Sequence, residues 1–157
     1  PVDVVGMDGG LVEVNTNRGV HNYTGSCGSS FSPDAPEQMV ELQLTQPAAV
    51  TITLEGIEDG FDPILYMRSD CEAEEPRDFC DDAGFGTDEE LRFAWLDRGR
   101  YFVFVDGYST ANTGVASVAF DVTPLELPAC DDEVDNDGDG AVDCADSDCA
   151  DAGFCAQ

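Results

Sequence analysis

Alternation between apolar and polar residues is the feature that most restricts how this 157-residue chain can fold. In Val50–Leu54 the apolar side chains would share one face of a strand and the threonines the other. Convincing helical periodicity is absent, and the one helical turn that we expect lies around Asp34–Gln38. Alternating runs bounded by Gly, Asp, Asn and Pro predict strands at Leu11–Val14, Val20–Tyr23, Met39–Leu44, Val50–Leu54, Pro63–Arg68, Leu91–Leu96, Tyr101–Asp106 and Val115–Val122.

Short strands without crossover helices pair antiparallel, so we expect an all-β fold: an antiparallel β-sandwich of the jelly-roll type. Tyr101–Val105 is apolar on both faces, which predicts a central strand. Val2–Val5 is an extra strand candidate, separated from Leu11–Val14 by a glycine-rich stretch. Residues 1–14 therefore have two interpretations: a hairpin within the same sheet, or an N-terminal arm that pairs with the open sheet edge of another subunit.

The charge balance excludes several classes of partner. The chain has 34 Asp and Glu against 6 basic residues, all of them Arg, which gives a net charge of −28. Nucleic acid binding needs a cationic surface, and anionic membranes would repel such a chain. No apolar run approaches the length of a membrane-spanning helix, so we expect no membrane insertion.

Catalysis is not expected either. The one histidine, His21, makes a His-based zinc site or a His-activated nucleophile improbable. Paired carboxylates could serve glycoside hydrolysis, but no spacing among the many acids singles out a pair. We therefore expect a protein that is not an enzyme.

Seven cysteines indicate disulfide bonds, because no C-x2-C pair offers the spacing of a zinc site. Disulfides imply an oxidising compartment, so the expected location is extracellular or the bacterial cell surface. Asn22-Tyr23-Thr24 is an N-glycosylation sequon, which agrees with export and makes Asn22 a candidate for glycosylation.

The spacing of the cysteines suggests their pairing. Cys71 and Cys80 flank a short acidic loop and are predicted partners. Four more cysteines lie close together near the C-terminus and would form two bridges with three connectivities open: Cys130, Cys144, Cys149 and Cys155. Cys27 is then left over, either as a buried free thiol or as the partner in an intermolecular bridge.

The C-terminal part differs from the rest in composition. Residues 130–157 contain ten acids and no base, and they follow a segment with prolines at 124 and 128. We expect residues 1–14 to be an arm or extra strands, residues 15–124 the β-sandwich, residues 125–129 a stiff linker, and residues 130–157 a small disulfide-rich tail.

The tail carries the pattern of a calcium-binding loop. Alternate Asp residues followed by Gly140 match positions 1, 3, 5 and 6 of a twelve-residue loop, whose oxygens converge on one ion. No helix-forming stretch flanks it, and position 12 is Asp, so it is similar to thrombospondin type 3 and dockerin-type loops. The alternative is a disordered acidic tail, against which the cysteines weigh. The predicted Ca²⁺ ligands are Asp135, Asp137, Asp139, the Ala141 carbonyl, Asp143 and Asp146.

The body also resembles a known family. Phe61–Cys71 (FDPILYMRSDC), Cys80–Asp82 (CDD) and Gly99–Tyr108 (GRYFVFVDGY), followed by Gly114, occur in the order found in bacterial pre-peptidase C-terminal domains. This resemblance, over residues 25–123, implies a secreted, non-catalytic β-sandwich that accompanies peptidases and surface proteins. Some relatives bind calcium at sandwich loops, which implies a second metal site; the alternative is turn-forming, solvated carboxylates. The matching acids are Asp62, Asp81, Asp82 and Asp106.

Two functions fit these observations. The first is a calcium-binding structural or adhesive extracellular protein that self-associates, as a homopolymeric surface fibre built by strand donation, or that binds another surface protein or glycan. The alternative is an accessory module of a secreted hydrolase, which would bind a glycan or protein through aromatics such as Tyr108, Phe85 or Trp95. Trp95 lies in a strand pattern, so we expect it in the core.

Overall fold

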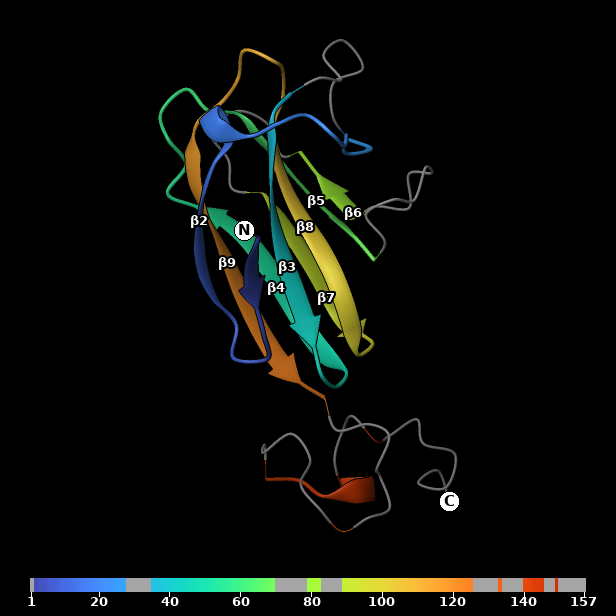
Figure 1. Ribbon diagram of the computed structural model, residues 1–157. Helices are drawn as coiled ribbons and strands as arrows, with labels where there is room; N and C mark the ends of the chain where they lie inside the picture. The colour runs from blue at the N-terminus through green and yellow to red at the C-terminus, as the bar shows by residue number, and fades with distance from the viewer. Residues whose placement is uncertain are drawn as a thin grey trace.

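The alternating segments form two β-sheets that pack face to face (Figure 1). This computed structural model describes residues 2–27, 35–69, 79–82, 89–125, 133, 140–145 and 149. The sheet orders are β1-β3-β8-β5-β6 and β2-β9-β4-β7, and the predicted β-sandwich is confirmed. The strands are β1 Asp3–Val5, β2 Gly10–Asn15, β3 Glu37–Leu44, β4 Ala48–Glu55, β5 Pro63–Arg68, β6 Phe79–Asp81, β7 Glu90–Leu96, β8 Gly99–Gly107 and β9 Val115–Pro124.

The core lies between the two sheets and follows the sequence pattern. In β4, Val50, Ile52 and Leu54 are buried, whereas Thr51 and Thr53 on the other face are partly exposed. β8 lies between β3 and β5, as expected for a strand that is apolar on both faces. Its outer face is buried because residues 20–27, which we call the covering segment, pack Tyr23 and Cys27 against Phe104 and its neighbours.

The first two strands lie in different sheets. β1 pairs in parallel with β3 at the edge of the first sheet, and β2 pairs antiparallel with β9 at the edge of the second. A turn in which the Gly9 N–H donates to the Gly6 carbonyl leads from one sheet to the other. The expected hairpin within one sheet is therefore wrong, because this turn redirects the chain instead of reversing it. Pairing with another subunit stays a prediction.

Local departures from the predicted elements have local causes. Val20–Tyr23 makes only one bridge, in which the Glu37 N–H donates to the Val20 carbonyl at 3.0 Å. Glu37 and Gln38 start β3, so the helical turn expected around them is wrong. A 3-10 helix, η1 (Thr16–Arg18), was not predicted; the Asn15 side chain caps it by accepting the Asn17 N–H. The short strand β6 was also not predicted.

The described end of the sandwich extends one residue into the predicted linker. Leu125 is buried, and its N–H donates to the Pro47 carbonyl at 2.9 Å. Residues 126–129 lie outside the described residues. Within the tail, the second 3-10 helix, η2, covers Asp143–Ala145. No helix in the described part of the chain is long and apolar enough to span a membrane.

Candidate functional site

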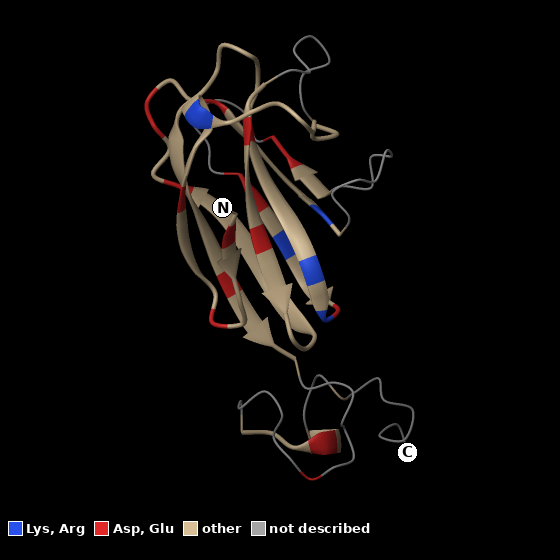
Figure 2. Cartoon of the chain, viewed as in Figure 1, with Lys and Arg blue, Asp and Glu red and all other residues tan. Residues whose placement is uncertain are grey.

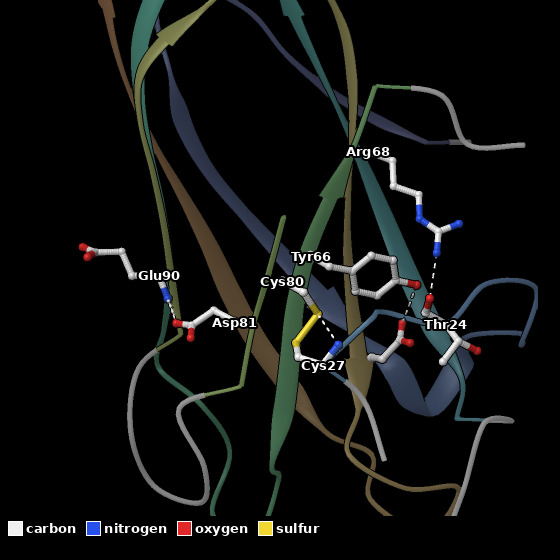
Figure 3. The surroundings of a disulfide bond; sticks show 8 residues. Thr24, Cys27, Tyr66, Arg68, Cys80, Asp81 and Glu90 are labelled. Atoms are coloured by element: carbon white, nitrogen blue, oxygen red, sulfur yellow. Dashed lines mark hydrogen bonds between the residues drawn. A yellow bond between two sulfur atoms is a disulfide. The ribbon is translucent and has the colours of Figure 1, made fainter. Parts of the chain in front are cut away.

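Four carboxylates gather where the edges of the two sheets adjoin; we call them the edge acid cluster: Asp62, Asp81, Asp82 and Glu89. Each lies at a strand end. Asp62 directly precedes β5, Asp81 ends β6 and Asp82 follows it, and Glu89 directly precedes β7. The Asp81 carboxylate accepts the Glu90 N–H at 2.9 Å, which links β6 of the first sheet to β7 of the second (Figure 3). The cluster therefore belongs to both sheets.

Glu89 is the unusual member of this cluster. It is fully buried, and neither carboxylate oxygen accepts a hydrogen bond from another residue in the described part of the chain. Its main-chain carbonyl accepts the Leu54 N–H at 3.0 Å, which fixes its backbone beside the end of β4. Burial, followed by the charges of Asp81, Asp82 and Asp62, raises the pKa of Glu89 to about 7. A buried carboxylate in such surroundings is costly unless a cation or a proton joins it.

Asp62 has a similar orphaned oxygen. Its Oδ1 is buried without a hydrogen-bond partner among the described residues. The backbone is held on both sides: its N–H donates to the Asn112 side-chain oxygen at 2.6 Å, and its carbonyl accepts the Tyr108 N–H at 2.8 Å. Burial, and to a lesser extent the charge of Asp82, raise the pKa of Asp62.

The donor set consists of oxygen atoms alone, the chemistry that Ca²⁺ selects. Among the residues that the structure describes, no three His, Cys, Asp or Glu side chains converge closely enough to form a metal site. Cation binding would therefore require the side chains of these carboxylates to rotate toward one common point. Water or carbonyl oxygens would complete the shell of six to eight ligands.

Asp106, the fourth acid implied by the family resemblance, interacts with other groups. It is buried, and it accepts a hydrogen bond from the Tyr66 hydroxyl at 3.3 Å. Burial, followed by the nearby charge of Glu37, raises the pKa of Asp106 to about 8. The family resemblance thus implied three members of the edge acid cluster and missed Glu89. A carboxylate directly before an alternating strand, as Asp62 is before β5, was the signal that could have found it.

The disulfide pattern corrects one prediction. Cys80 is bonded to Cys27, with a Cα–Cα distance of 5.7 Å, and not to Cys71 (Figure 3). Cys27 is therefore neither a free thiol nor an intermolecular partner. The covering segment brings Cys27 across the sheet to β6. The two cysteines are 53 residues apart, so their spacing in the sequence could not predict the bond. Cys71 lies outside the described residues.

The calcium loop predicted in the tail falls mostly outside the described residues, as Asp135, Asp137, Asp139 and Asp146 do. Gly140 adopts a φ of 95°, which suits the sharp turn expected at that position. The Asp143 carboxylate accepts the Glu133 N–H at 3.1 Å. Cys144 and Cys149 are both disulfide-bonded, whereas Cys130 and Cys155 lie outside the described part.

The remaining candidate residues are on the surface. Asn22 is exposed, and its glycosylation stays a prediction. Trp95 is 42% exposed and its indole N–H donates to Asp97 at 3.0 Å, so the core position expected for it is wrong. Tyr108 is exposed as well, and Phe85 lies outside the described residues. Figure 2 shows Asp and Glu on strands and loops throughout the sandwich, with arginine at few positions.

Comparison with known proteins identifies the fold alone. No family model matches the chain, and no curated protein matches it. Among solved structures it is similar to the pre-peptidase C-terminal domain of collagenase from Bacillus anthracis, with a TM-score of 0.52 and 12% identity. The match covers 77% of this chain and 95% of that domain. The body therefore has the sandwich fold that the motifs implied. Its disulfide fits a secreted or extracellular protein.

Proposed function

We propose that this chain is a non-catalytic, calcium-binding module of an extracellular protein, with a structural or adhesive role. The observation that carries the proposal is Glu89: a buried carboxylate whose oxygens accept no hydrogen bond from another described residue, beside Asp62, Asp81 and Asp82. A divalent cation would offset the repulsion among four acids and supply the missing partner. The sequon and the disulfide suit the same location.

A cation at this position would have a mechanical consequence for the fold. Asp81 lies on β6 and Glu89 directly precedes β7, so a shared ion would fasten an edge strand of one sheet to an edge strand of the other. The tail loop at residues 135–146 would hold a second calcium ion, as its carboxylate spacing predicts. Both sites act as fasteners, which suits a module that other molecules bind or pull on.

The test separates the two sites. The calcium stoichiometry is measured by isothermal titration for the parent protein, for Glu89→Gln and for Asp137→Ala. Each variant should lose one bound ion and keep the other. Glu90→Gln is the matched control: it removes the same charge one residue away, from a side chain that pairs with Arg92, and should keep both ions.

Thermal unfolding gives a second readout. Calcium at about 100 times its dissociation constant should stabilise the parent by roughly 2.7 kcal/mol per site. Glu89→Gln should lose the sandwich share of this gain, while in EDTA it should be at least as stable as the parent, because the amide removes one of four repelling acids. If Glu89→Gln keeps the full calcium response of the parent, the site is not where we place it.

The fold match favours a second candidate, an accessory module of a secreted hydrolase that binds a glycan or protein. Its basis is that the chain covers 95% of a domain that occurs in a collagenase. Self-association by strand donation, which the structural role includes, would require β1 to leave its own β3. Two measurements on the calcium-loaded protein discriminate between the roles. Filaments detected by light scattering favour the structural role. A monomer that sediments with an insoluble glycan or protein polymer favours the accessory role.

A further inference from the structure

A cavity of about 200 Å³ opens on the outer face of the first sheet, and the edge acid cluster has no part in it. Its walls come from the covering segment, from the first residues of β3, from Phe104 of β8 and from Val2 before β1. The space is large enough for one long side chain and too small for a folded element.

The walls of this cavity are apolar at the mouth and aromatic at the floor. Val20, 65% exposed, and Val2 stand at the surface. Tyr23 and Phe104 contribute rings with centroids 5.2 Å apart, and Met39 adds a thioether chain. Walls of this kind contact the methylene stem of a long side chain and leave its polar end to be bound separately.

The polar end of the cavity is formed by a buried carboxylate. Glu37 is 5% exposed and lines the cavity, and its two oxygens accept the Asn22 N–H at 2.8 and 3.0 Å. One N–H leaves further lone pairs of a carboxylate available. His21 Nδ1 lies 3.9 Å from Glu37 Oε2, and the buried Asp106 is close enough to interact electrostatically with Glu37. A cationic group entering here would therefore meet the charge of Glu37, whose carboxylate is itself buried.

The chain itself places a cation on the same rings. The Arg68 guanidinium stands 5.7 Å from the centroid of Tyr23 and 5.9 Å from that of Phe104, and it also donates to the Thr24 carbonyl at 2.7 Å (Figure 3). Aromatic faces attract cations through their quadrupole. Tyr23 and Phe104 therefore have two roles: Arg68 lies over their rings, and both residues also line the cavity.

We propose that this cavity binds one lysine or arginine side chain of a partner protein. The stem would lie between Val2, Val20 and the rings, with its charged end on Glu37. A net charge of −28 on a chain without lysine attracts basic partners over long range, and the cavity would then fix one of their side chains in place. This inference is independent of the calcium sites.

The test uses two peptides, acetyl-Gly-Lys-Gly-amide and its norleucine counterpart, which has the same stem without the charge. Binding is followed by chemical-shift changes of the Asn22 amide and the Gln38 side-chain amide in calcium-saturated protein. The lysine peptide should bind at least about tenfold more tightly than the norleucine peptide, and its affinity should fall as salt is added. Equal affinities for the two peptides, or no shift at either amide, would overturn the proposal.

Substitutions locate the site. Val20→Arg should fill the cavity with its own guanidinium and abolish binding, whereas Leu11→Arg, which adds the same charge at an equally exposed position outside the cavity, should leave the affinity unchanged. Glu37→Gln should weaken lysine binding about tenfold, and Glu41→Gln on the same face of β3 should not. Glu37 also accepts the Asn22 N–H, so Glu37→Gln could fail to fold. In that case the comparison of Val20→Arg with Leu11→Arg decides the test. Equal losses in Val20→Arg and Leu11→Arg would refute the cavity as the site.

Discussion

Replacing both Cys27 and Cys80 by Ala should lower the free energy of unfolding by about 4 kcal/mol. The bond joins residues 53 apart in sequence. Closing a loop of that length removes roughly 14 cal/mol/K of entropy from the unfolded chain, or about 4 kcal/mol at 25 °C. The folded state should change little, because Arg68 still holds the Thr24 carbonyl and Gly25 still packs against the Tyr66 ring, where a Cβ would come within 2.7 Å of Cδ1.

Equilibrium urea denaturation in EDTA, followed by far-ultraviolet circular dichroism, measures the effect without calcium binding. We expect a lower transition midpoint together with a steeper slope, since the unfolded variant is no longer cross-linked and exposes more surface. Reductant is not used, because it would also open the bonds of Cys144 and Cys149. A loss below about 1 kcal/mol with an unchanged slope would refute the loop-entropy reasoning.

Three further predictions concern the sandwich itself. Burial holds the pKa of Asp106 near 8 instead of its usual 3.8, so the folded protein retains this proton between those pH values and its stability falls as pH rises through them. Relative to the parent, Asp106→Asn should therefore gain about 4 kcal/mol from pH 5 to pH 8 in urea denaturation at each pH, and parallel curves would contradict this. Gly107→Ala should lower the free energy of unfolding by about 3 kcal/mol in the same assay, because the added Cβ would lie 1.6 Å from the Asn112 carbonyl oxygen. Gly6→Ala is the control: its Cβ meets nothing within 4 Å, so the free energy of unfolding should hardly change. Thr16→Val should lower the free energy of unfolding by about 2 kcal/mol, since the buried Gly114 N–H donates to the Thr16 hydroxyl at 3.0 Å and would lose its acceptor. An unchanged urea midpoint would show that water replaces the hydroxyl as acceptor.

The parts of the fold that the sequence predicted are those in which pattern and cause are local. β5 matches its predicted bounds, and β8 is central, because side-chain alternation depends only on neighbouring residues and on which faces are buried. The position of β1 was not predictable in this way. Its pairing with β3 depends on a turn of glycines that is equally compatible with a hairpin, an arm or a crossing to the other sheet.

The candidate site shows the same division. Asp62, Asp81 and Asp82 were implied by the resemblance to pre-peptidase C-terminal domains, whose motifs they belong to. Glu89 was missed because no motif of the resemblance includes it; its place directly before β7 was the one local signal, and its burial follows from tertiary packing that the sequence does not show. Cys27 was misassigned for a related reason: short spacing favours nearby partners, whereas the covering segment brings together residues far apart in sequence.

The way the chain leaves the sandwich determines how force would pass through the protein. Residues beyond Leu125 are joined to β9, which lies between β2 and β4 and pairs antiparallel with both. Antiparallel hydrogen bonds run perpendicular to their strands, so a pull along β9 loads both ladders in shear, with many bonds strained at once instead of one after another. The Leu125 N–H donates to the Pro47 carbonyl, which adds one more hydrogen bond at the C-terminal end of β9, where a pulling force would be applied. Traction along β9 would therefore be resisted by both ladders together.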